Sequence, residues 1–306
     1  MLRRALIAGS NSRLLQRTAS RLPWTRAVAM RFVAGETLDD AVAVARRLNS
    51  RGASVSLDAL GEAVLEPRIA HAAAETYRET LTRMAAAGIE GSISVKLTQL
   101  GLDIDPRLCR DLVADVCAAA AALGSDVTLD MEDSSHTPAT VDLVLALRGL
   151  GHGNVGCAVQ SYLYRTPDDV AKLTAAGASL RLCKGAYAEP PEVAYQKKAE
   201  VDAAYARLTQ TLLRGGVYPR IATHDKRLVR HAKNLARRYG REPREFEFQM
   251  LYGVGEALQR ELVADGYRLR VYVPFGSEWY RYFMRRLAER PANLAFFVRA
   301  VAGRRT

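Results

Sequence analysis

Two adjacent arginines, Arg285 and Arg286, stand in the stretch RYFMRRLAER at positions 281–290. At helical spacing, one face of this segment carries Tyr282, Arg285, Arg286 and Glu289, and a second, apolar face carries Trp279, Phe283 and Leu287. Neighbouring guanidinium groups repel each other unless anions neutralise them. Glu289 is one anion within reach, and a substrate carboxylate held by both arginines is another. The segment predicts either a carboxylate-binding helix or an ordinary solvated helix, and its place in the fold decides between them.

Charged side chains also interrupt β-branched runs, where burial is costly unless the charges are paired. Lys96 lies in SISVKLTQL, Asp130 in DVTLDMED and Arg181 in SLRLCKGAY. Other runs end with polar residues, namely Asp58, Glu132, Gln160, Lys184, Thr223, His224, Gln249 and Tyr272. Taken singly, each could be a cap, a solvated side chain or a satisfied buried residue. Together they predict one polar site, provided that the strand ends meet.

The elements that must bring these residues together alternate regularly between strand and helix. Short β-branched runs at 53–60, 92–100, 126–133, 155–162, 179–187, 219–224, 245–251 and 268–275 are separated by helical patterns. Such alternation predicts parallel pairing with right-handed crossovers. Eight units of about 30 residues predict an α/β fold of the (βα)8 TIM-barrel type, with its chemistry at the C-terminal strand ends. A doubly wound sheet is the alternative. In the barrel, the arginine helix follows the last strand and lies over the mouth.

The positive charge of the chain is concentrated at its start. The formal net charge is +11, and residues 1–35 hold seven arginines and no carboxylate before Glu36. We interpret 1–35 as a basic helical arm and 36–306 as the barrel domain. The arm is superficially similar to a transit peptide. It is also typical of an amphipathic helix on an anionic membrane surface, and a solvated leading helix is the simpler interpretation. Nucleic acid is not an expected partner, because aromatic residues are not interleaved with the basic ones.

Other motifs are excluded by their spacing or context. The four cysteines form no CxxC pair and the five histidines no HxxxH or HExxH pattern, so we expect buried reduced thiols and no metal site. The run GHGNVG at 151–156 matches GxGxxG but follows a helical pattern and precedes a strand, so it predicts a turn. No uninterrupted apolar run is long enough for a transmembrane helix.

Several motifs taken together are similar to those of the proline dehydrogenase family. They are RFVAGETLDDAV, SVKLTQLG, LDMED, VQSYLYRTPDD, RLCKGAY, ATHD, EFQMLYGVGE, RVYVPFG and YFMRRLAERPAN, in that order, from about residue 31 to 300. The chain resembles the small monofunctional bacterial form. The resemblance implies a distorted (βα)8 barrel that holds FAD at its mouth and oxidises L-proline to Δ1-pyrroline-5-carboxylate by hydride transfer to flavin N5. It also implies a membrane quinone as electron acceptor and a separate pyrroline-5-carboxylate dehydrogenase for the next step of proline catabolism to glutamate. We therefore expect a cytoplasmic enzyme bound peripherally to the inner face of the cell membrane.

The resemblance also implies roles for individual residues. Arg285 and Arg286 match the pair that binds the proline carboxylate, and Glu289 matches the ion-pair partner of that pair. Lys96 and Asp130 match polar residues near the substrate and are expected to form a buried ion pair. Walls of the proline pocket are matched by Leu251, Tyr272 and Tyr282. Arg181 matches the arginine beside flavin N5, and other flavin contacts are matched by Met131, Gln160, Lys184, Gly185, Ala186, Thr223 and His224.

Two other functions stay open from the residues. A 4-hydroxyproline dehydrogenase of the same family would differ in pocket shape near Tyr282. A barrel aldolase would use Lys96 as a Schiff-base lysine and would be colourless. A membrane or nucleic-acid adaptor is a non-enzyme alternative, but it has no reason to place buried charges at strand ends.

Overall fold

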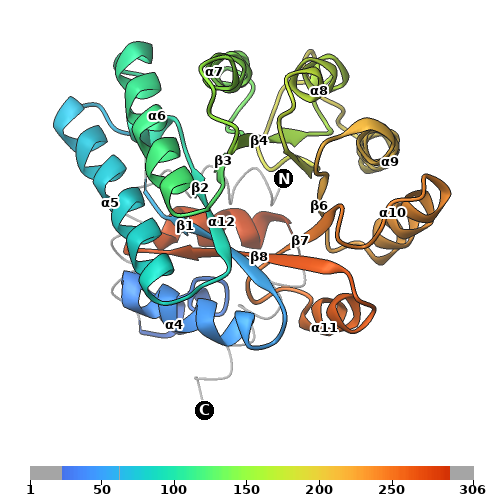
Figure 1. The fold of residues 1–306 in the computed structure, drawn as a ribbon, viewed down its shortest axis with the longest axis horizontal. Coiled ribbons are helices and arrows are strands. Elements are labelled where there is room, and N and C mark those ends of the chain that lie inside the picture. The colour runs from blue at the N-terminus through green and yellow to red at the C-terminus, as the bar shows by residue number, and fades with distance from the viewer. Residues whose placement is uncertain (1–22, 62, 290–306) are drawn as a thin grey trace.

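Eight parallel strands close into a barrel in the computed structural model of the chain, which describes residues 23–61 and 63–289 (Figure 1). The strands follow chain order around the ring: β1 Ser54–Ala59, β2 Gly91–Val95, β3 Val127–Leu129, β4 Val155–Gln160, β5 Leu180–Cys183, β6 Arg220–Ala222, β7 Glu247–Leu251 and β8 Arg268–Phe275. The ring closes where β8 pairs with β1, with Ser56 opposite Tyr272. The barrel prediction is confirmed, and the doubly wound alternative is wrong.

Helices connect the strands and form an outer layer around the barrel (Figure 1). They are α4 Leu38–Asn49, α5 Pro67–Ala86, α6 Pro106–Ala122, α7 Thr137–Gly149, α8 Thr166–Ala175, α9 Lys198–Gly215, α10 Lys226–Arg238 and α11 Glu256–Ala264, with the short 3-10 helix η1 Thr98–Leu100 after β2. Pro67, Pro106 and other prolines lie in the first turns, where the missing N–H costs nothing. The GHGNVG run joins α7 to β4, as its context predicts.

Every strand except β8 is shorter than the sequence pattern predicts, and three of them end four or more residues early. The runs 92–100, 126–133 and 179–187 leave the sheet at Val95, Leu129 and Cys183. A parallel strand continues only while its backbone can hydrogen-bond to a neighbouring strand in register. Beyond that point the chain leaves the sheet. The residues that follow form the loops of the barrel mouth, which are therefore built from the polar ends of these runs.

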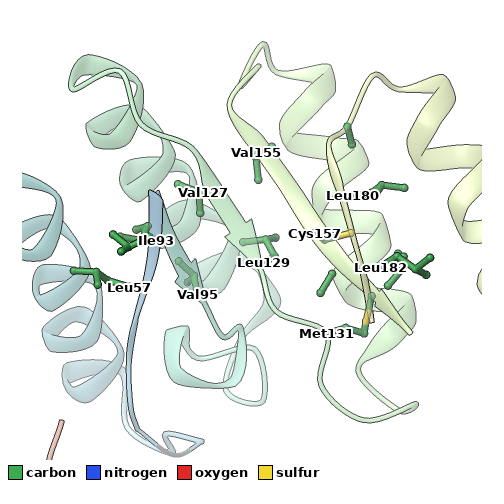
Figure 2. Close-up of a cluster of buried hydrophobic side chains, with 14 of the residues drawn as sticks. Leu57, Ile93, Val95, Val127, Leu129, Met131, Val155, Cys157, Leu180 and Leu182 are labelled. Atoms are coloured by element: carbon green, nitrogen blue, oxygen red, sulfur yellow. The ribbon is translucent and has the colours of Figure 1, made fainter. Parts of the chain in front are cut away.

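The apolar core lies between the barrel and its helices, not inside the barrel. Outward-facing side chains of β1, β2 and β3 such as Leu57, Ile93 and Leu129 are fully buried in this layer (Figure 2). Each such side chain contributes roughly 1.5–3 kcal/mol by leaving water. The alternate positions point inward, and several are polar, including Ser56 and Ser94, whose hydroxyls meet at 3.0 Å. Barrel interiors usually hold branched aliphatic side chains, so a polar interior is a specific feature of this one.

The last helix, α12 (Trp279–Glu289), follows β8 at the mouth and packs against α3 (Pro23–Ala29). Their shared apolar cluster comprises Val28, Ala29, Phe32, Val33, Trp279, Tyr280, Tyr282 and Phe283. The cluster also contacts Leu60 and Val254, which follow β1 and β7, and Tyr272, which lies within β8. α3, which belongs to the predicted basic arm, therefore holds α12 over the mouth. Residues 1–22 of the arm lie outside the described part of the chain. The division at residue 35 stays a prediction.

The cysteines are free thiols, as expected. Cys109, Cys117 and Cys157 are buried, and burial raises the pKa of each thiol to about 12. Cys183 is half-buried. The three buried thiols stay protonated at neutral pH, so they act as small apolar side chains.

No helix among residues 23–61 and 63–289 is both long and apolar enough to cross a bilayer.

Candidate active site

Four charged residues form a compact cluster at the centre of the mouth. Lys96 Nζ lies 2.5 Å from Asp58 Oδ1 and 3.7 Å from Asp130 Oδ2. Arg181 Nη1 lies 2.6 Å from Asp130 Oδ1, and Tyr272 donates its hydroxyl to Asp130 Oδ2 at 2.8 Å. These side chains come from five different strands or strand ends. The closed barrel brings residues together that are as many as 214 positions apart in the chain, from 58 to 272.

The main partner of Lys96 differs from the predicted one. The expected ion pair with Asp130 is the longer of the two contacts, and the close contact is with Asp58. Arg181 reaches across the barrel and occupies Asp130, so Lys96 bonds instead to the carboxylate on its other neighbouring strand. Asp58 is completely buried, and a carboxylate at that depth requires such a partner.

The cluster is balanced in charge, with Asp58 and Asp130 opposite Lys96 and Arg181. Burial and the nearby carboxylates of Asp130 and Asp58 raise the pKa of the Tyr272 phenol well above its usual value. The phenol therefore stays protonated and acts as a hydrogen-bond donor at neutral pH. A balanced set of this kind keeps its charges in a poorly solvated place, where they interact strongly with a bound molecule.

Arg181 is the most constrained member of the cluster. Its guanidinium donates to Gln249 Oε1 at 2.6 Å and to the hydroxyls of Ser94 at 2.8 Å and Ser56 at 3.3 Å, besides its contact with Asp130. It also lies 5.2 Å from the ring centre of Tyr272. With 4% of its surface exposed, Arg181 has one fixed orientation.

A second group of predicted residues lines the mouth at β4 and β5. Gln160 donates to the Glu132 carbonyl at 2.8 Å and accepts from the Ala186 N–H at 3.4 Å. Lys184 Nζ lies 2.6 Å from Asp202 Oδ1. The backbone of Gly185 has a φ of +119°, and a Cβ there would lie 2.4 Å from the ring of Tyr162. This loop therefore requires glycine, because the backbone passes directly over an aromatic ring.

The remaining predicted mouth residues follow β3, β6 and β7. The Leu251 N–H donates to His224 Nε2 at 2.9 Å, which requires Nε2 to be unprotonated. Thr223 accepts from the Asp225 N–H at 3.1 Å, and Met131 is buried beside Asp130 in the chain. These contacts fix the ends of neighbouring strands relative to one another.

The arginine pair lies on α12 at the mouth. Arg286 is half-buried, and its guanidinium carbon is 5.1 Å from the ring centre of Tyr282. Tyr282 itself is buried in the α3–α12 cluster and does not share a solvated polar face. The side chains of Arg285, Leu287 and Glu289 lie outside the described residues. The position of the helix thus favours the carboxylate-binding interpretation over a solvated surface helix.

Comparison with known proteins gives the family. The family model described as proline dehydrogenase matches residues 41–299. The chain belongs to the proline dehydrogenase family. It is 37% identical to proline dehydrogenase 1 of Bacillus subtilis subsp. natto, with 98% of this chain and 99% of that one covered. It is 38% identical to proline dehydrogenase of Deinococcus radiodurans, with 98% and 97% covered.

A solved structure agrees with the fold. Proline utilization A from Bdellovibrio bacteriovorus, inactivated by N-propargylglycine, matches with a TM-score of 0.82 and 27% identity. The match covers 87% of this chain and 33% of that longer one. The protein is thus an enzyme of the proline dehydrogenase type, and the aldolase and adaptor alternatives are wrong.

Three polar residues to which the sequence assigns no role hold predicted residues or neighbouring loops in place. Asp58 holds Lys96, Gln249 holds Arg181, and Glu132 accepts from both the N–H and the hydroxyl of Thr98 at 3.1 and 2.7 Å. For Asp58 and Gln249 the sequence signal is a polar residue at an inward position of a β-branched run, which does not indicate its partner. Glu132 lies in the loop after β3.

His136 connects two loops of the mouth and gives the proline dehydrogenase fold a pH-dependent contact. Its ring nitrogens lie 2.9 Å from Asp103 and 2.8 Å from Asp133, which follow η1 and β3. Burial lowers the pKa of His136, but the hydrogen bonds and charges of the two carboxylates outweigh burial and raise it above the usual value. The two carboxylates therefore favour the charged ring, which bridges the two loops.

We expect His136→Asn to lower the free energy of unfolding by about 1–2 kcal/mol at pH 6. A raised folded-state pKa gives stability that is fully present below the unfolded value of about 6.5. That stability is lost as the pH rises through the folded value, so the difference from wild type should shrink between pH 6 and a pH well above the folded value. Urea unfolding at both pH values measures it. His71→Asn, at an exposed position of α5, is the control. If His136→Asn lowers the free energy of unfolding equally at both pH values, the charged bridge is contradicted.

Proposed function

We propose that this chain binds FAD at the barrel mouth and oxidises L-proline to Δ1-pyrroline-5-carboxylate. The observation that carries the proposal is the buried cluster of Lys96, Asp58, Asp130 and Arg181 at the mouth of a family barrel. Relatives named proline dehydrogenase align over nearly their full length.

The residues at the mouth fit a flavin nucleotide. A flavin ring presents nitrogen and oxygen acceptors, and Arg181 and Gln160 supply donors at β5 and β4. A pyrophosphate needs cations, and Lys184, Lys198 and Arg227 gather around Asp202 beside the start of α10. The close passage of Gly185 over Tyr162 gives the smooth backbone surface that a flat ligand requires. We assign Met131, Ala186, Thr223 and His224 to the same cofactor surface.

The other predicted residues bind the substrate. Arg285 and Arg286 hold its carboxylate, with Glu289 as their ion-pair partner, and Lys96 lies beneath it. Leu251, Tyr272 and Tyr282 form the walls that orient the ring and exclude water. At this site a bound FAD would supply the acceptor for the hydride of proline C5, and the redox chemistry would belong to the cofactor. Arg181 supplies a fixed positive charge beside the ring where negative charge develops, and Asp130 keeps that arginine in place.

The visible spectrum of the purified protein tests the proposal. We expect flavin bands that bleach on anaerobic addition of L-proline. If the bands bleach only with 4-hydroxyproline, the substrate is 4-hydroxyproline, and the shape of the pocket near Tyr282 would account for that preference. A colourless protein that fails to take up added FAD contradicts the proposal entirely.

We propose a membrane quinone as the electron acceptor, with the basic arm at residues 1–35 making peripheral contact with the inner face of the cell membrane. The arm carries seven arginines and no carboxylate, which suits an anionic lipid surface. Pyrroline-5-carboxylate then passes to a separate dehydrogenase. A variant lacking residues 1–22, which keeps α3 and its contact with α12, should lose binding to anionic vesicles and keep proline oxidation with a soluble dye. Unchanged vesicle binding contradicts the role of the arm.

A further inference from the structure

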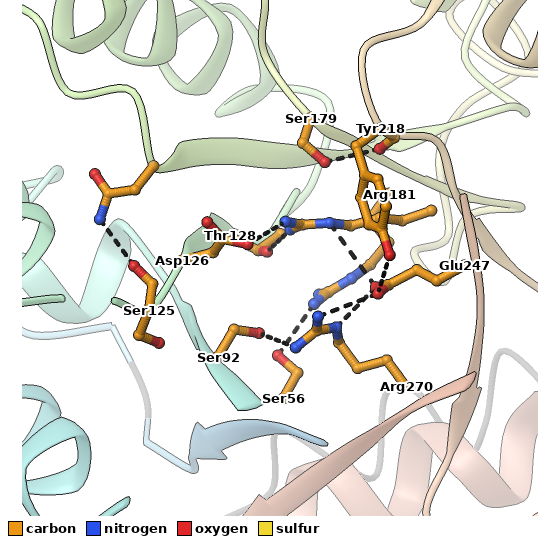
Figure 3. A network of polar contacts seen from close by, with 12 residues as sticks. Ser56, Ser92, Ser125, Asp126, Thr128, Ser179, Arg181, Tyr218, Glu247 and Arg270 are labelled. Carbon is orange, nitrogen blue, oxygen red and sulfur yellow. Dashed lines mark hydrogen bonds and ion pairs between the residues drawn. The ribbon is translucent and has the colours of Figure 1, made fainter. Parts of the chain in front are cut away.

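A continuous line of buried, hydrogen-bonded polar side chains runs through the barrel interior, from the N-terminal ends of β7 and β8 to Arg181. Arg270 lies against Glu247 with two guanidinium nitrogens, at 2.7 Å to Oε1 and 3.1 Å to Oε2 (Figure 3). Gln249 then donates its amide N–H to Glu247 Oε1 at 2.5 Å. At its other end, the Gln249 carbonyl accepts from Arg181 Nε at 2.6 Å. Glu247 and Gln249 are successive inward positions of β7, so the strand itself sets their spacing.

The order of these contacts gives Gln249 a single direction. A side-chain amide has one donating end and one accepting end. A carboxylate only accepts, so Glu247 must face the amide nitrogen of Gln249. The carbonyl of Gln249 is then turned toward Arg181, which only donates. Glu247 therefore fixes the orientation of the Gln249 amide, so that Arg181 Nε faces the amide oxygen and not the amide nitrogen.

Glu247 keeps its charge at every physiological pH. Burial, with 1% of the residue exposed, raises the pKa of the carboxyl. The charges of Arg270 and Arg220 outweigh burial and hold the pKa at about 2. The acceptor that fixes Gln249 is thus permanent. Glu247 lies too deep to touch a ligand at the mouth, since Gln249 and Arg181 stand between them.

We propose that Glu247 and Gln249 are positioning residues that orient the Arg181 guanidinium toward the reacting part of the cofactor. This inference rests on the proposed function, in which Arg181 faces a bound flavin. The line of contacts holds the guanidinium from below at Nε, while Asp130 and Ser94 hold its other nitrogens. Without the contact at Nε, the planar group is free to tilt about its remaining bonds. The positive charge then no longer lies where the reduced cofactor needs it.

The substitutions Glu247→Gln and Gln249→Met test the line at two points. Both preserve side-chain size. Gln249→Met removes the acceptor for Arg181 Nε, and Glu247→Gln removes the carboxylate that fixes the direction of the Gln249 amide. Thr209→Val is the matched control, because it preserves side-chain size and removes a buried hydrogen bond, from the Thr209 hydroxyl to the Tyr205 carbonyl at 2.8 Å. That bond lies within α9, outside the line of contacts from Glu247 to Arg181.

Two measurements separate positioning from general loss of structure: the midpoint potential of the bound flavin, and the kcat and KM for L-proline. We expect Glu247→Gln and Gln249→Met to shift the potential to more negative values and to lower kcat by about 10- to 100-fold. KM should change little, because the carboxylate-binding arginines are intact. Thr209→Val should leave the potential unchanged. The sign is decisive for Glu247→Gln, since simple removal of a negative charge shifts the potential to more positive values.

A positive shift in Glu247→Gln, or wild-type potential and kcat in Gln249→Met, overturns the inference. If Glu247→Gln fails to fold, Gln249→Met still tests the line because it leaves the Glu247–Arg270 pair in place. Failure of the proposed function would be recognised separately, because the wild-type protein would then show no flavin bands that bleach with proline.

Discussion

Arg286→Met is expected to raise the KM for L-proline by about 100-fold while leaving the flavin bound. Removing one partner of a poorly solvated, hydrogen-bonded charge pair costs about 2–5 kcal/mol, and each 1.4 kcal/mol is tenfold in affinity. Arg286 is half-buried on α12, and its guanidinium is held over the ring of Tyr282. Met preserves the length of the side chain and its packing. Arg285→Met should behave alike, because the two residues are adjacent on the helix.

Steady-state kinetics and the flavin spectrum measure the effect together. A substrate carboxylate is bound in the ground state and in the transition state, so KM should rise more than kcat falls. Arg26→Met is a suitable control, because it removes an arginine of α3 whose guanidinium is half-exposed and paired with Glu36 at 2.9 Å. Unchanged KM in both Arg285→Met and Arg286→Met would show that the pair does not bind the carboxylate.

The second large effect is expected from Lys96→Met, which leaves Asp58 without its cation. Asp58 is fully buried, and Lys96 Nζ lies 2.5 Å from it. Removing one partner of a buried ion pair typically costs about 3–5 kcal/mol of stability. The variant should also lose activity, since Lys96 lies beside the other charges of the mouth. Acidification should narrow the stability deficit, because the isolated carboxyl then takes up a proton in the folded state.

The double variant Lys96→Met/Asp58→Asn distinguishes stability from catalysis. It removes both charges, so most of the lost free energy of unfolding should return while activity stays low. Lys233→Met is a matched control, because its pair with the half-exposed Asp265 at 2.7 Å should contribute no more than about 1 kcal/mol. A stability loss in Lys96→Met as small as that of the control would mean that Asp58 is stabilised by other groups.

The predicted effects of these substitutions depend on the polar interior of the barrel. Ser56, Ser94, Arg181 and Gln249 occupy inward positions that aliphatic side chains fill in most barrels of this type. Stability therefore comes mainly from the outer layer between strands and helices, and the interior is free to hold charges in fixed positions. Such an arrangement is suited to chemistry that needs a fixed electrostatic environment.

The sequence by itself determined the type and order of the elements. Eight β-branched runs with helical patterns between them predict the barrel because parallel pairing and right-handed crossovers leave few other arrangements. Inward polar positions such as Lys96, Asp130 and Arg181 are visible from the period-2 alternation of the strands. The buried state of Cys109 and Cys117 follows from the apolar helical pattern around them. These features depend on local sequence, so a single chain is enough to predict them.

Only the tertiary structure decided which polar groups meet. Lys96 bonds mainly to Asp58 because Arg181 crosses the barrel and occupies Asp130. Tyr282 packs against α3 because the start of the chain returns to the mouth, which no spacing within α12 reveals. Contacts across a closed barrel depend on the register of every strand and on the length of each side chain. The sequence therefore predicts that a polar centre exists, while ring closure decides its pairings.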